Sequence, residues 1–203
     1  MKRVLVMCFM LVLLPLTLDA RRNGEGFFVG IGSGIAHYDD GGLVSDLNGN
    51  GGNYDMDSVS AAYKLYLGYK FNHEATLEGS IIGYGVYDVK NNGNTTERLK
   101  PKSAAVYLNY GQDFWHNQIR PFVVAGAGLL WLDPQESTLY DNELFFSLHY
   151  GLGLLYSPHI LQGWGIRAAY EADWSRFDAK GDLGGGSYNA TIGTLYLGVE
   201  HKF

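Results

Sequence analysis

The most regular pattern in the chain lies between residues 144 and 156, where apolar residues alternate with small or polar ones. The apolar series occupies every second position: Leu144, Phe146, Leu148, Tyr150, Leu152 and Leu154. Because side chains alternate across a β-strand, the pattern predicts a strand with one wholly apolar face. The segment is longer than a usual globular strand of about five or six residues. It suits a tilted strand that crosses a bilayer.

Similar patterns, some weaker, predict strands elsewhere in the chain. These segments are 27–35, 59–69, 75–89, 104–114, 120–132, 164–174 and 191–203. The segment 120–132 is apolar on both sides, so the pattern leaves its two faces unassigned. With 144–156 the total is eight, and single-chain bacterial barrels have an even number of strands.

The connections between these segments alternate in length. Residues 72–73, 115–119 and 157–163 form short connections. The longer ones are rich in Gly, Asn and Asp: 39–58, 88–102, 133–142 and 177–189. This asymmetry is typical of transmembrane barrels, which have short periplasmic turns and long extracellular loops. We therefore predict an all-β fold, an eight-stranded antiparallel transmembrane up-and-down barrel. A soluble barrel would also alternate, but its apolar face would point inward.

The first twenty residues have a different character. Lys2 and Arg3 precede an apolar run over residues 4–18, and Ala20 offers a small residue for cleavage. This order is that of a secretory signal peptide, and the run is too short for a comfortable transmembrane helix. We expect residues 1–20 to be removed and residues 21–203 to form the barrel domain. Removal takes away Cys8, the single cysteine, so no disulfide or thiolate chemistry is expected.

The charge balance and the histidine content limit the classes of partner that we expect. The chain has 15 Lys and Arg against 21 Asp and Glu, a net charge of −6. Without a basic stripe to follow a phosphate backbone, nucleic acid is not an expected partner. The histidines show no metal-ligand spacing, so we expect no metal and no cofactor.

The polar face of the predicted strands carries charged residues. An eight-stranded barrel has an interior just wide enough for side chains to fill. If the apolar face meets lipid, the following charged residues point inward: Lys64, Glu78, Arg167, Glu171 and Glu200. Because buried charges must pair, we predict a lumenal ion-pair network. Such a network either fills the lumen as a static plug or gates a thin ion path.

One loop resembles a calcium-binding pattern. Residues 46–51, with Asp57 at the twelfth position, match much of that pattern. Glutamate is expected at the last position, and loops rich in Asn and Gly match by chance. A flexible surface loop is the favoured interpretation.

Ser147 and His149 are the candidates for nucleophilic chemistry. They lie two residues apart on one strand face, and Glu143 and Glu171 could lie near them. Some outer-membrane barrels modify the acyl chains of lipid A with a serine, a histidine and an acidic partner near the outer rim. His149 instead falls in the middle of its strand, so we expect no catalytic residue.

The end of the chain carries a family resemblance. Phe203 is preceded by apolar residues at alternate positions, Leu195, Leu197 and Val199. This arrangement resembles the C-terminal signature of outer-membrane proteins that the barrel assembly machinery reads. Residues 67–72 (LGYKFN) and 120–128 (RPFVVAGAG) are similar to strands of the OmpA-like and opacity-type barrels. The resemblance covers essentially the whole mature chain. OmpA has a periplasmic peptidoglycan-binding domain after its barrel, and here we expect the barrel domain only.

The resemblance implies a bacterial outer-membrane protein without enzymatic activity. Such a barrel has a structural role in the envelope, or serves adhesion or immune evasion through its extracellular loops. The alternatives are a narrow porin-like channel gated by the lumenal charges and, third, a lipid A-modifying enzyme. The expected partners are outer-membrane lipid and lipopolysaccharide, the barrel assembly machinery, periplasmic chaperones and a host surface ligand. We expect a monomer.

Overall fold

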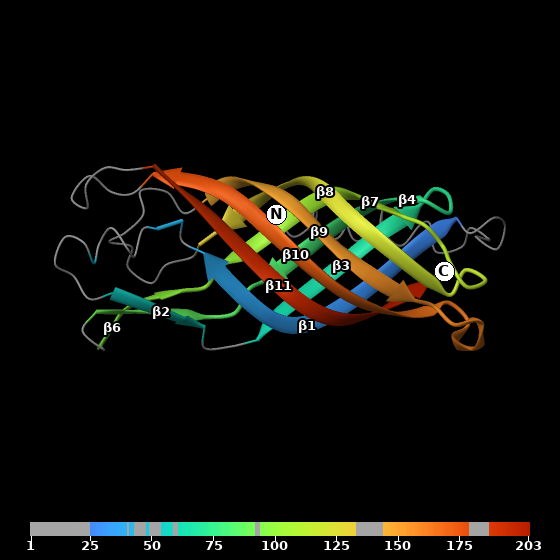
Figure 1. The fold of residues 1–203 in the computed structure, drawn as a ribbon, viewed down its shortest axis with the longest axis horizontal. Helices are drawn as coiled ribbons and strands as arrows, with labels where there is room; N and C mark the ends of the chain where they lie inside the picture. The colour runs from blue at the N-terminus through green and yellow to red at the C-terminus, as the bar shows by residue number, and fades with distance from the viewer. Residues whose placement is uncertain are drawn as a thin grey trace, which may run out of the picture.

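Eight strands form a closed antiparallel barrel in the computed structural model (Figure 1). The structure describes residues 25–39, 41–42, 48, 54–58, 61–91, 94–132, 144–178 and 187–203. The barrel strands are β1 (Gly26–Asp39), β3 (Ala62–Lys70), β4 (Ala75–Gly83), β7 (Lys102–Gly111), β8 (Ile119–Trp131), β9 (Leu144–Tyr156), β10 (Trp164–Asp178) and β11 (Ser187–Lys202). Each strand pairs with the next along the chain, and β11 pairs with β1 to close the sheet. The predicted fold is confirmed.

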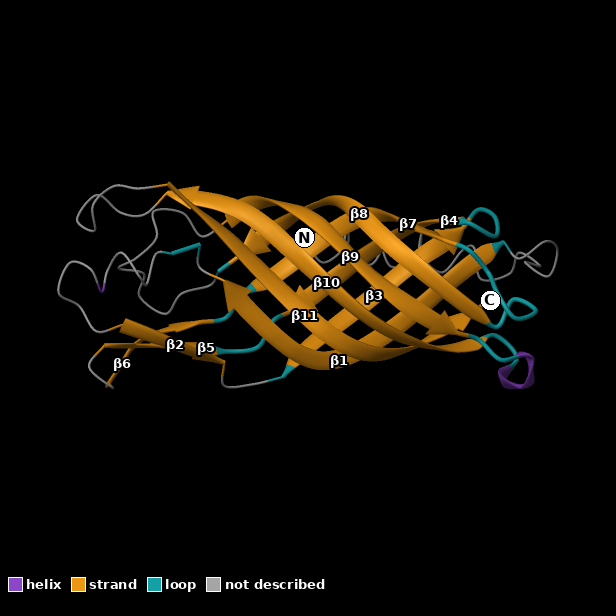
Figure 2. Ribbon diagram, viewed as in Figure 1, coloured by secondary structure: helices purple, strands orange, loops and turns teal. Residues whose placement is uncertain are grey.

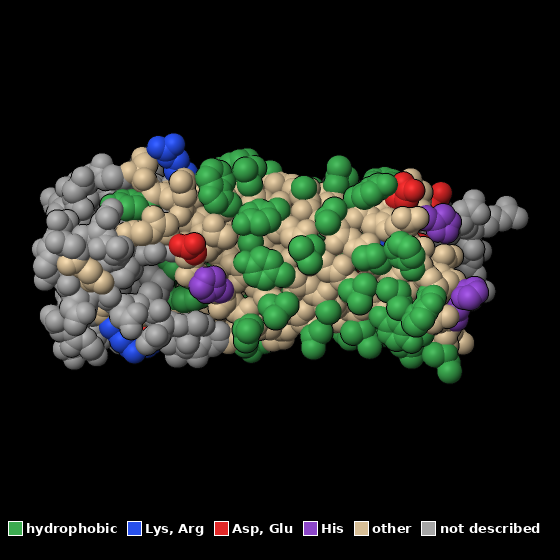
Figure 3. All heavy atoms as spheres, viewed as in Figure 1, with side chains coloured by type: hydrophobic (Ala, Val, Ile, Leu, Met, Phe, Trp, Pro, Cys, Tyr) green, Lys and Arg blue, Asp and Glu red, His purple; other side chains and the backbone are tan. Residues whose placement is uncertain are grey.

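The alternation along each strand decides which side chains face outward. In β9 the even-numbered residues from Leu144 to Leu154 are exposed, whereas Ser147 and His149 between them are buried. Figure 3 shows the result as a belt of hydrophobic side chains over the barrel wall, with charged side chains toward the two ends. The barrel is therefore apolar outside and polar inside, the reverse of a soluble globular domain.

The two ends of the barrel differ. We call the end where β1, β4, β8 and β10 finish the loop end, and the opposite end the turn end. At the turn end Asn72 closes the β3–β4 connection by accepting hydrogen bonds from the amides of Glu74 (2.8 Å) and Ala75 (2.7 Å). The β9–β10 connection contains one 3-10 turn, η2 (His159–Leu161). No helix in the described part of the chain is long and apolar enough to cross a membrane.

The segment 75–89 is not one strand, so this prediction is wrong in its second half. β4 stops at Gly83, and Gly85 adopts a positive φ of 87° that turns the chain away from the barrel. Beyond it, β5 (Tyr87–Asn91) pairs with β6 (Asn94–Leu99) and with β2 (Tyr54–Ser58) in a separate sheet. Figure 2 shows this sheet beyond the loop end. Two of the predicted loops, 39–58 and 88–102, therefore contain strands.

The faces of the 120–132 segment, which the sequence left open, follow from strand pairing. β8 is hydrogen-bonded to β7 on one side and β9 on the other. In this register Arg120, Phe122 and Val124 are buried in the lumen, and Val123 and Leu129 are exposed.

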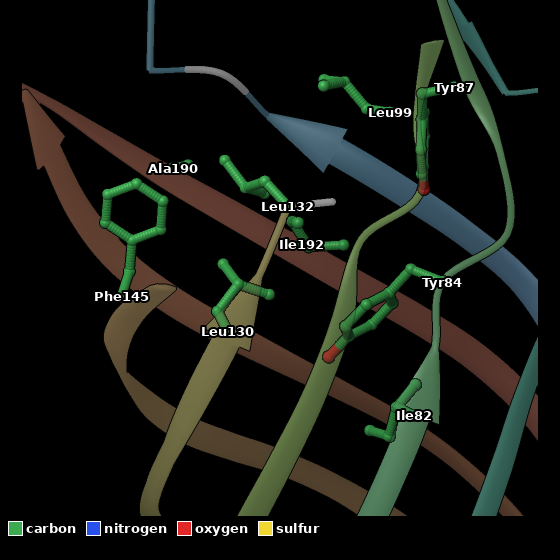
Figure 4. Packing of buried hydrophobic residues seen from close by; sticks show 9 residues of the cluster. All are labelled: Ile82, Tyr84, Tyr87, Leu99, Leu130, Leu132, Phe145, Ala190 and Ile192. Atoms are coloured by element: carbon green, nitrogen blue, oxygen red, sulfur yellow. The ribbon is translucent and has the colours of Figure 1, made fainter. Parts of the chain in front are cut away.

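An apolar cluster lies at the loop end of the barrel (Figure 4). We call it the apolar cap, and its members are Ile82, Tyr84, Tyr87, Leu99, Leu130, Leu132, Phe145, Ala190 and Ile192. Most come from barrel strands or the residues next to them, and Tyr87 and Leu99 come from β5 and β6 of the separate sheet. This sheet therefore contributes side chains that cover one end of the barrel.

Candidate functional site

Two charged clusters lie in the lumen below the apolar cap. The histidine cluster consists of Lys64, His149, Glu171 and Asp173, and the arginine cluster consists of Glu78, Arg167 and Glu200. All seven residues are buried. Strand β10 contributes to both clusters, because Arg167, Glu171 and Asp173 are separated by even numbers of residues and so share one face.

His149 is held between two carboxylates. In the register of β9 and β10 it lies directly opposite Asp173, and its Nδ1 is 3.1 Å from the Asp173 carboxylate. Its Nε2 is 3.0 Å from Glu171. The ring of Tyr107 stacks on the imidazole, with ring centroids 4.5 Å apart. These contacts fix both the position and the orientation of the ring.

This geometry indicates that His149 is an imidazolium. A neutral imidazole has one donor and one acceptor nitrogen, and ionised carboxylates can only accept, so two such contacts need both nitrogens protonated. The charge count agrees. Among the described barrel residues, the other buried charged side chains are three cations and four anions: Lys64, Arg120, Arg167, Glu78, Glu171, Asp173 and Glu200. A protonated His149 makes this buried set electrically neutral.

Glu171 is the centre of the histidine cluster. Lys64 forms an ion pair with it from β3, across the lumen. The hydroxyl of Tyr196 donates to Glu171 at 2.6 Å and is itself 3.3 Å from the Lys64 ammonium. Asp173 in turn accepts from the hydroxyls of Tyr84 and Ser147, the latter at 3.1 Å. Every buried carboxylate of this cluster therefore has several partners, as a buried charge requires.

Arg167 is the centre of the arginine cluster. It binds Glu78 through both terminal nitrogens, at 2.8 and 3.0 Å, and its Nε is 3.1 Å from Glu200. The planar guanidinium also lies over the rings of Tyr66 and Phe122, with its central carbon 4.4 and 4.9 Å from the centroids. A bidentate pair combined with stacking suits arginine and would not suit lysine.

Tyrosine rings separate the two clusters. The Lys64 ammonium lies 4.9–5.4 Å from the ring centroids of Tyr66, Tyr107 and Tyr196. Cations are attracted to such rings within about 6 Å. Gly30 makes room for this layer, because a Cβ at this position would collide with the ring of Tyr66. The polar contacts therefore continue from one cluster to the other through aromatic side chains.

The structure brings the five predicted charged residues together in these two clusters, each in contact with an oppositely charged partner. Sequence reasoning missed other members. Asp173 shares a strand face with Glu171, which the sequence pattern shows, but His149 was considered only as a catalytic residue. Asn109, which donates to Glu78 at 2.7 Å, and Arg120, which donates to Asn109 at 2.8 Å, extend the arginine cluster. Arg120 was missed because the faces of its strand were unassigned.

Ser147 and His149 do not have the geometry of a nucleophile and its base. The Ser147 hydroxyl donates to Asp173, and both side chains are buried in the lumen at no more than 1 % exposure. A nucleophilic serine needs its proton directed at the base and access to substrate. Glu143, considered with them, lies outside the described residues.

The predicted lipid-facing residues of β9 are all on the outer wall. Leu144, Phe146, Leu148, Tyr150, Leu152 and Leu154 are 44–65 % exposed. The predicted assembly residues Leu195, Leu197, Val199 and Phe203 are also exposed. The amide of Phe203 donates to the carbonyl of Phe27 at 2.9 Å, so the terminal aromatic lies at the closing seam of the barrel.

Most of the calcium-loop pattern, and the whole of the predicted signal peptide, lie outside the described residues. Within the described part of the chain, no group of three or more His, Cys, Asp or Glu side chains is placed to hold a metal ion.

Comparison with solved structures finds the same fold in bacterial outer-membrane proteins. Ail, the attachment invasion locus protein of Yersinia pestis, is 19% identical, with a TM-score of 0.52 over 89% of this chain and 99% of that chain. Neisserial surface protein A is 17% identical, with a TM-score of 0.56 over 89% and 100%. The outer membrane protein AlkL is 14% identical, with a TM-score of 0.63 over 91% and 93%.

A scan against protein-family models finds no match, and a search of curated proteins finds none either. The likeness to the solved structures therefore concerns the fold. The chain has the fold of the eight-stranded outer-membrane barrels.

Proposed function

We propose that this chain is a non-enzymatic bacterial outer-membrane protein, whose plugged barrel presents extracellular loops for a structural or adhesive role at the cell surface. The observation that carries the proposal is the inverted distribution of side chains. Apolar residues cover the outer wall, and the buried charges pair inside. Monomeric soluble proteins rarely expose so extensive an apolar surface, whereas a barrel in lipid requires one.

The contents of the lumen support a plug. The histidine and arginine clusters cross the barrel, and the apolar cap covers them at the loop end. An ion entering from that end would meet hydrocarbon before it reached a charge, and transfer of a charge into such surroundings is costly. In this proposal the lumenal network stabilises the barrel and does not conduct.

The chemistry of two loops supports a surface role, whereas a third, 88–102, contains four Lys and Arg and two acidic residues. The segments 39–58 and 133–142 contain Asp and Glu and no Lys or Arg. Acidic segments attract basic surfaces and repel polyanions. Ail has been crystallised with the heparin analogue sucrose octasulfate. For this chain we propose a basic patch on a host surface protein as the loop ligand.

Arginine substitutions on β9 test the membrane assignment. Leu148→Arg and Leu152→Arg would each place a charge in hydrocarbon, at a cost of about 2–4 kcal/mol near the bilayer midplane. We expect both variants to lose the heat-modifiable folded band in outer-membrane fractions, whereas the matched controls Leu148→Ala and Leu152→Ala should keep it. Normal assembly of both arginine variants would contradict the proposal.

Planar-bilayer conductance of the refolded chain separates the plug from the narrow channel. We expect no discrete openings in the parent protein. Openings whose conductance changes in Glu78→Ala or Arg167→Ala would establish the channel instead. Altered lipid A in cells that overexpress the chain would point to the lipid A-modifying enzyme.

A further inference from the structure

A groove of about 550 Å³ lies on the outer wall of the barrel. It spans five neighbouring strands, from β3 through β4, β7 and β8 to β9, and its outward-facing residues are all apolar or glycine. The volume falls within the range of small-molecule sites, about 300–1,000 Å³. We call it the wall groove.

The wall groove exists because three small residues lie close together on the outer wall. Val106 of β7 pairs with Gly79 of β4 on one side and with Ala127 of β8 on the other. Ala104 is the next outward-facing residue on β7, so the floor bends around Val106 from Gly79 through Ala104 to Ala127. Larger exposed side chains form the rim: Leu65, Leu67, Ile81, Leu129 and Phe146.

Packing within the protein does not require a glycine at position 79. A Cβ at Gly79 would have one neighbour within 4 Å among the described residues, the Ala105 carbonyl oxygen at 3.8 Å, which is an ordinary contact. At Gly126, by contrast, a Cβ would lie 2.2 Å from the Val106 carbonyl oxygen. The space beside Gly79 is therefore open to the surroundings of the outer wall.

The wall groove lies in the half of the barrel nearer the loop end. In each of the five strands its residues lie within five positions of the strand terminus at that end. Outer-membrane barrels have their long loops outside the cell, so this half of the barrel crosses the outer leaflet. That leaflet consists mainly of lipopolysaccharide, whose lipid A part carries several acyl chains.

The shape of the wall groove favours one kind of occupant. Inside a bilayer the hydrophobic effect does not favour one apolar neighbour over another, so van der Waals packing decides. An unfilled hollow leaves its lining atoms without contact partners. A second copy of the barrel would present another convex wall, which touches the first along a narrow strip and leaves the floor empty. A lipid acyl chain is narrow and flexible, so it can follow the bent floor.

We propose that the wall groove binds one acyl chain of lipid A in the outer leaflet. The groove is continuous with the lipid-facing wall, and the bound chain exchanges more slowly than the lipid around it because it packs on the floor as well as the rim. The site rests on the outer-membrane location and not on the loops, so its failure would leave the proposed surface role intact.

The test is a titration with lipid A of nanodiscs that contain the refolded full chain and deuterated phosphatidylcholine, followed by methyl NMR. We expect shifts of the Ile81 and Leu129 methyl groups that saturate with the mole fraction of lipid A, and cross-relaxation from its acyl protons to these methyls. Gly79→Leu and Ala127→Leu fill the groove, so each should weaken binding by about fivefold or more through lost contacts. The matched control is Ala125→Leu, which adds the same side chain on the outward face of β8 outside the groove.

A second titration with protonated phosphatidylethanolamine, and chemical cross-linking in the same lipids, test the other occupants. A preference for lipid A that only the two groove variants lose would support the proposal. Shifts that do not saturate would overturn it, and so would equal affinities in the groove variants and in Ala125→Leu, provided that the heat-dependent gel shift shows all variants folded. Equal affinity for phosphatidylethanolamine, or a cross-linked dimer that both groove variants abolish, would also overturn it.

Discussion

Both lumenal clusters neutralise buried carboxylates, but they do so with different cations. The histidine cluster neutralises Glu171 and Asp173 with a lysine and an imidazolium. Hydroxyl groups donate further hydrogen bonds to the same two carboxylates. In the arginine cluster one cation, the Arg167 guanidinium, pairs with both Glu78 and Glu200, and neutral donors from Asn109 and Tyr66 complete their hydrogen bonds. The histidine cluster contacts the apolar cap through Tyr84, and the residues of the arginine cluster line a cavity of about 820 Å³ at the turn end.

This difference predicts two kinds of vulnerability. A cluster with several partners tolerates the loss of one of them, but it depends on a histidine, the side chain whose unperturbed pKa lies nearest to neutral pH. A cluster built on one arginine keeps its charge at every accessible pH, but it has no replacement if that residue is lost. We therefore expect the histidine cluster, near the loop end, to tolerate the loss of one partner but to depend on pH. We expect the arginine cluster, near the turn end, to depend on Arg167 but not on pH.

The largest expected effect is that of Arg167→Met. The variant leaves two buried carboxylates without their cation, which costs about 3–5 kcal/mol of unfolding free energy. Urea unfolding in lipid vesicles, followed by tryptophan fluorescence, measures the loss. Lys64→Met should cost less, about 1–3 kcal/mol, because His149 and Tyr196 still contact Glu171.

A double substitution serves as the control for this comparison. Arg167→Met combined with Glu78→Gln removes one of the two unpaired charges, so it should regain part of the lost stability. If Lys64→Met cost as much as Arg167→Met, the proposed redundancy of the histidine cluster would be wrong.

The second-largest expected effect is a dependence of folding stability on pH, which we expect His149 to cause. Below about pH 6.5, where an ordinary histidine is protonated, folding needs no extra proton and the full stability is present. Above it, the unfolded chain loses the proton that the cluster requires, so stability falls as the pH rises. The groups facing the ring are Glu171, Asp173, Tyr107 and, through Glu171, Lys64.

The measurement is the urea midpoint of the parent and of His149→Gln between about pH 5 and pH 9. The parent should lose stability with rising pH across this range, and the variant should be less stable at low pH with a flatter dependence. Arg167→Met keeps the histidine and should retain the slope. An equal slope in His149→Gln would show that another group carries the dependence.

The smallest effect is expected for an ion pair outside the barrel. In the β2–β5–β6 sheet, Arg98 donates to Asp88 at 2.8 Å, and this hydrogen bond lowers the pKa of the Asp88 carboxyl. The Arg98 side chain is half exposed, and exposed ion pairs contribute little to stability. Arg98→Gln should raise the pKa of Asp88 toward its ordinary value, as seen by carboxyl NMR titration.

The same substitution should leave the urea midpoint at pH 7 unchanged within error. Any contribution of the lowered pKa is present above the unfolded-state value and is lost only as the pH falls through the acidic range. A loss of stability at pH 7 as large as that of Lys64→Met would remove the distinction between buried and exposed pairs.

The sequence indicated which residues share a strand face, but not the contacts between those residues. The period of two placed Lys64, Glu78, Arg167, Glu171 and Glu200 on the inner face, and all five are buried there. It could not say which of them meet. Their partners lie on different strands at heights that depend on the tilt of the sheet, and a pattern of neighbouring residues contains no information on tilt.

The end of the third strand shows a second limit. The apolar pattern continues past Gly83, and only the positive φ of Gly85 reveals that the chain leaves the barrel. A glycine permits this conformation without requiring it, so the sequence alone allowed a longer strand.

The sequence by itself determined the number of barrel strands and, for most of them, the outer and inner faces. These properties follow from a period of two, which adjacent residues display. Only the tertiary structure decided the facing of 120–132, the separate β2–β5–β6 sheet, the meeting of Lys64 with Glu171 and the cavity beside Arg120. Each of these depends on contacts between distant segments, which form only when the sheet closes at a particular tilt and register.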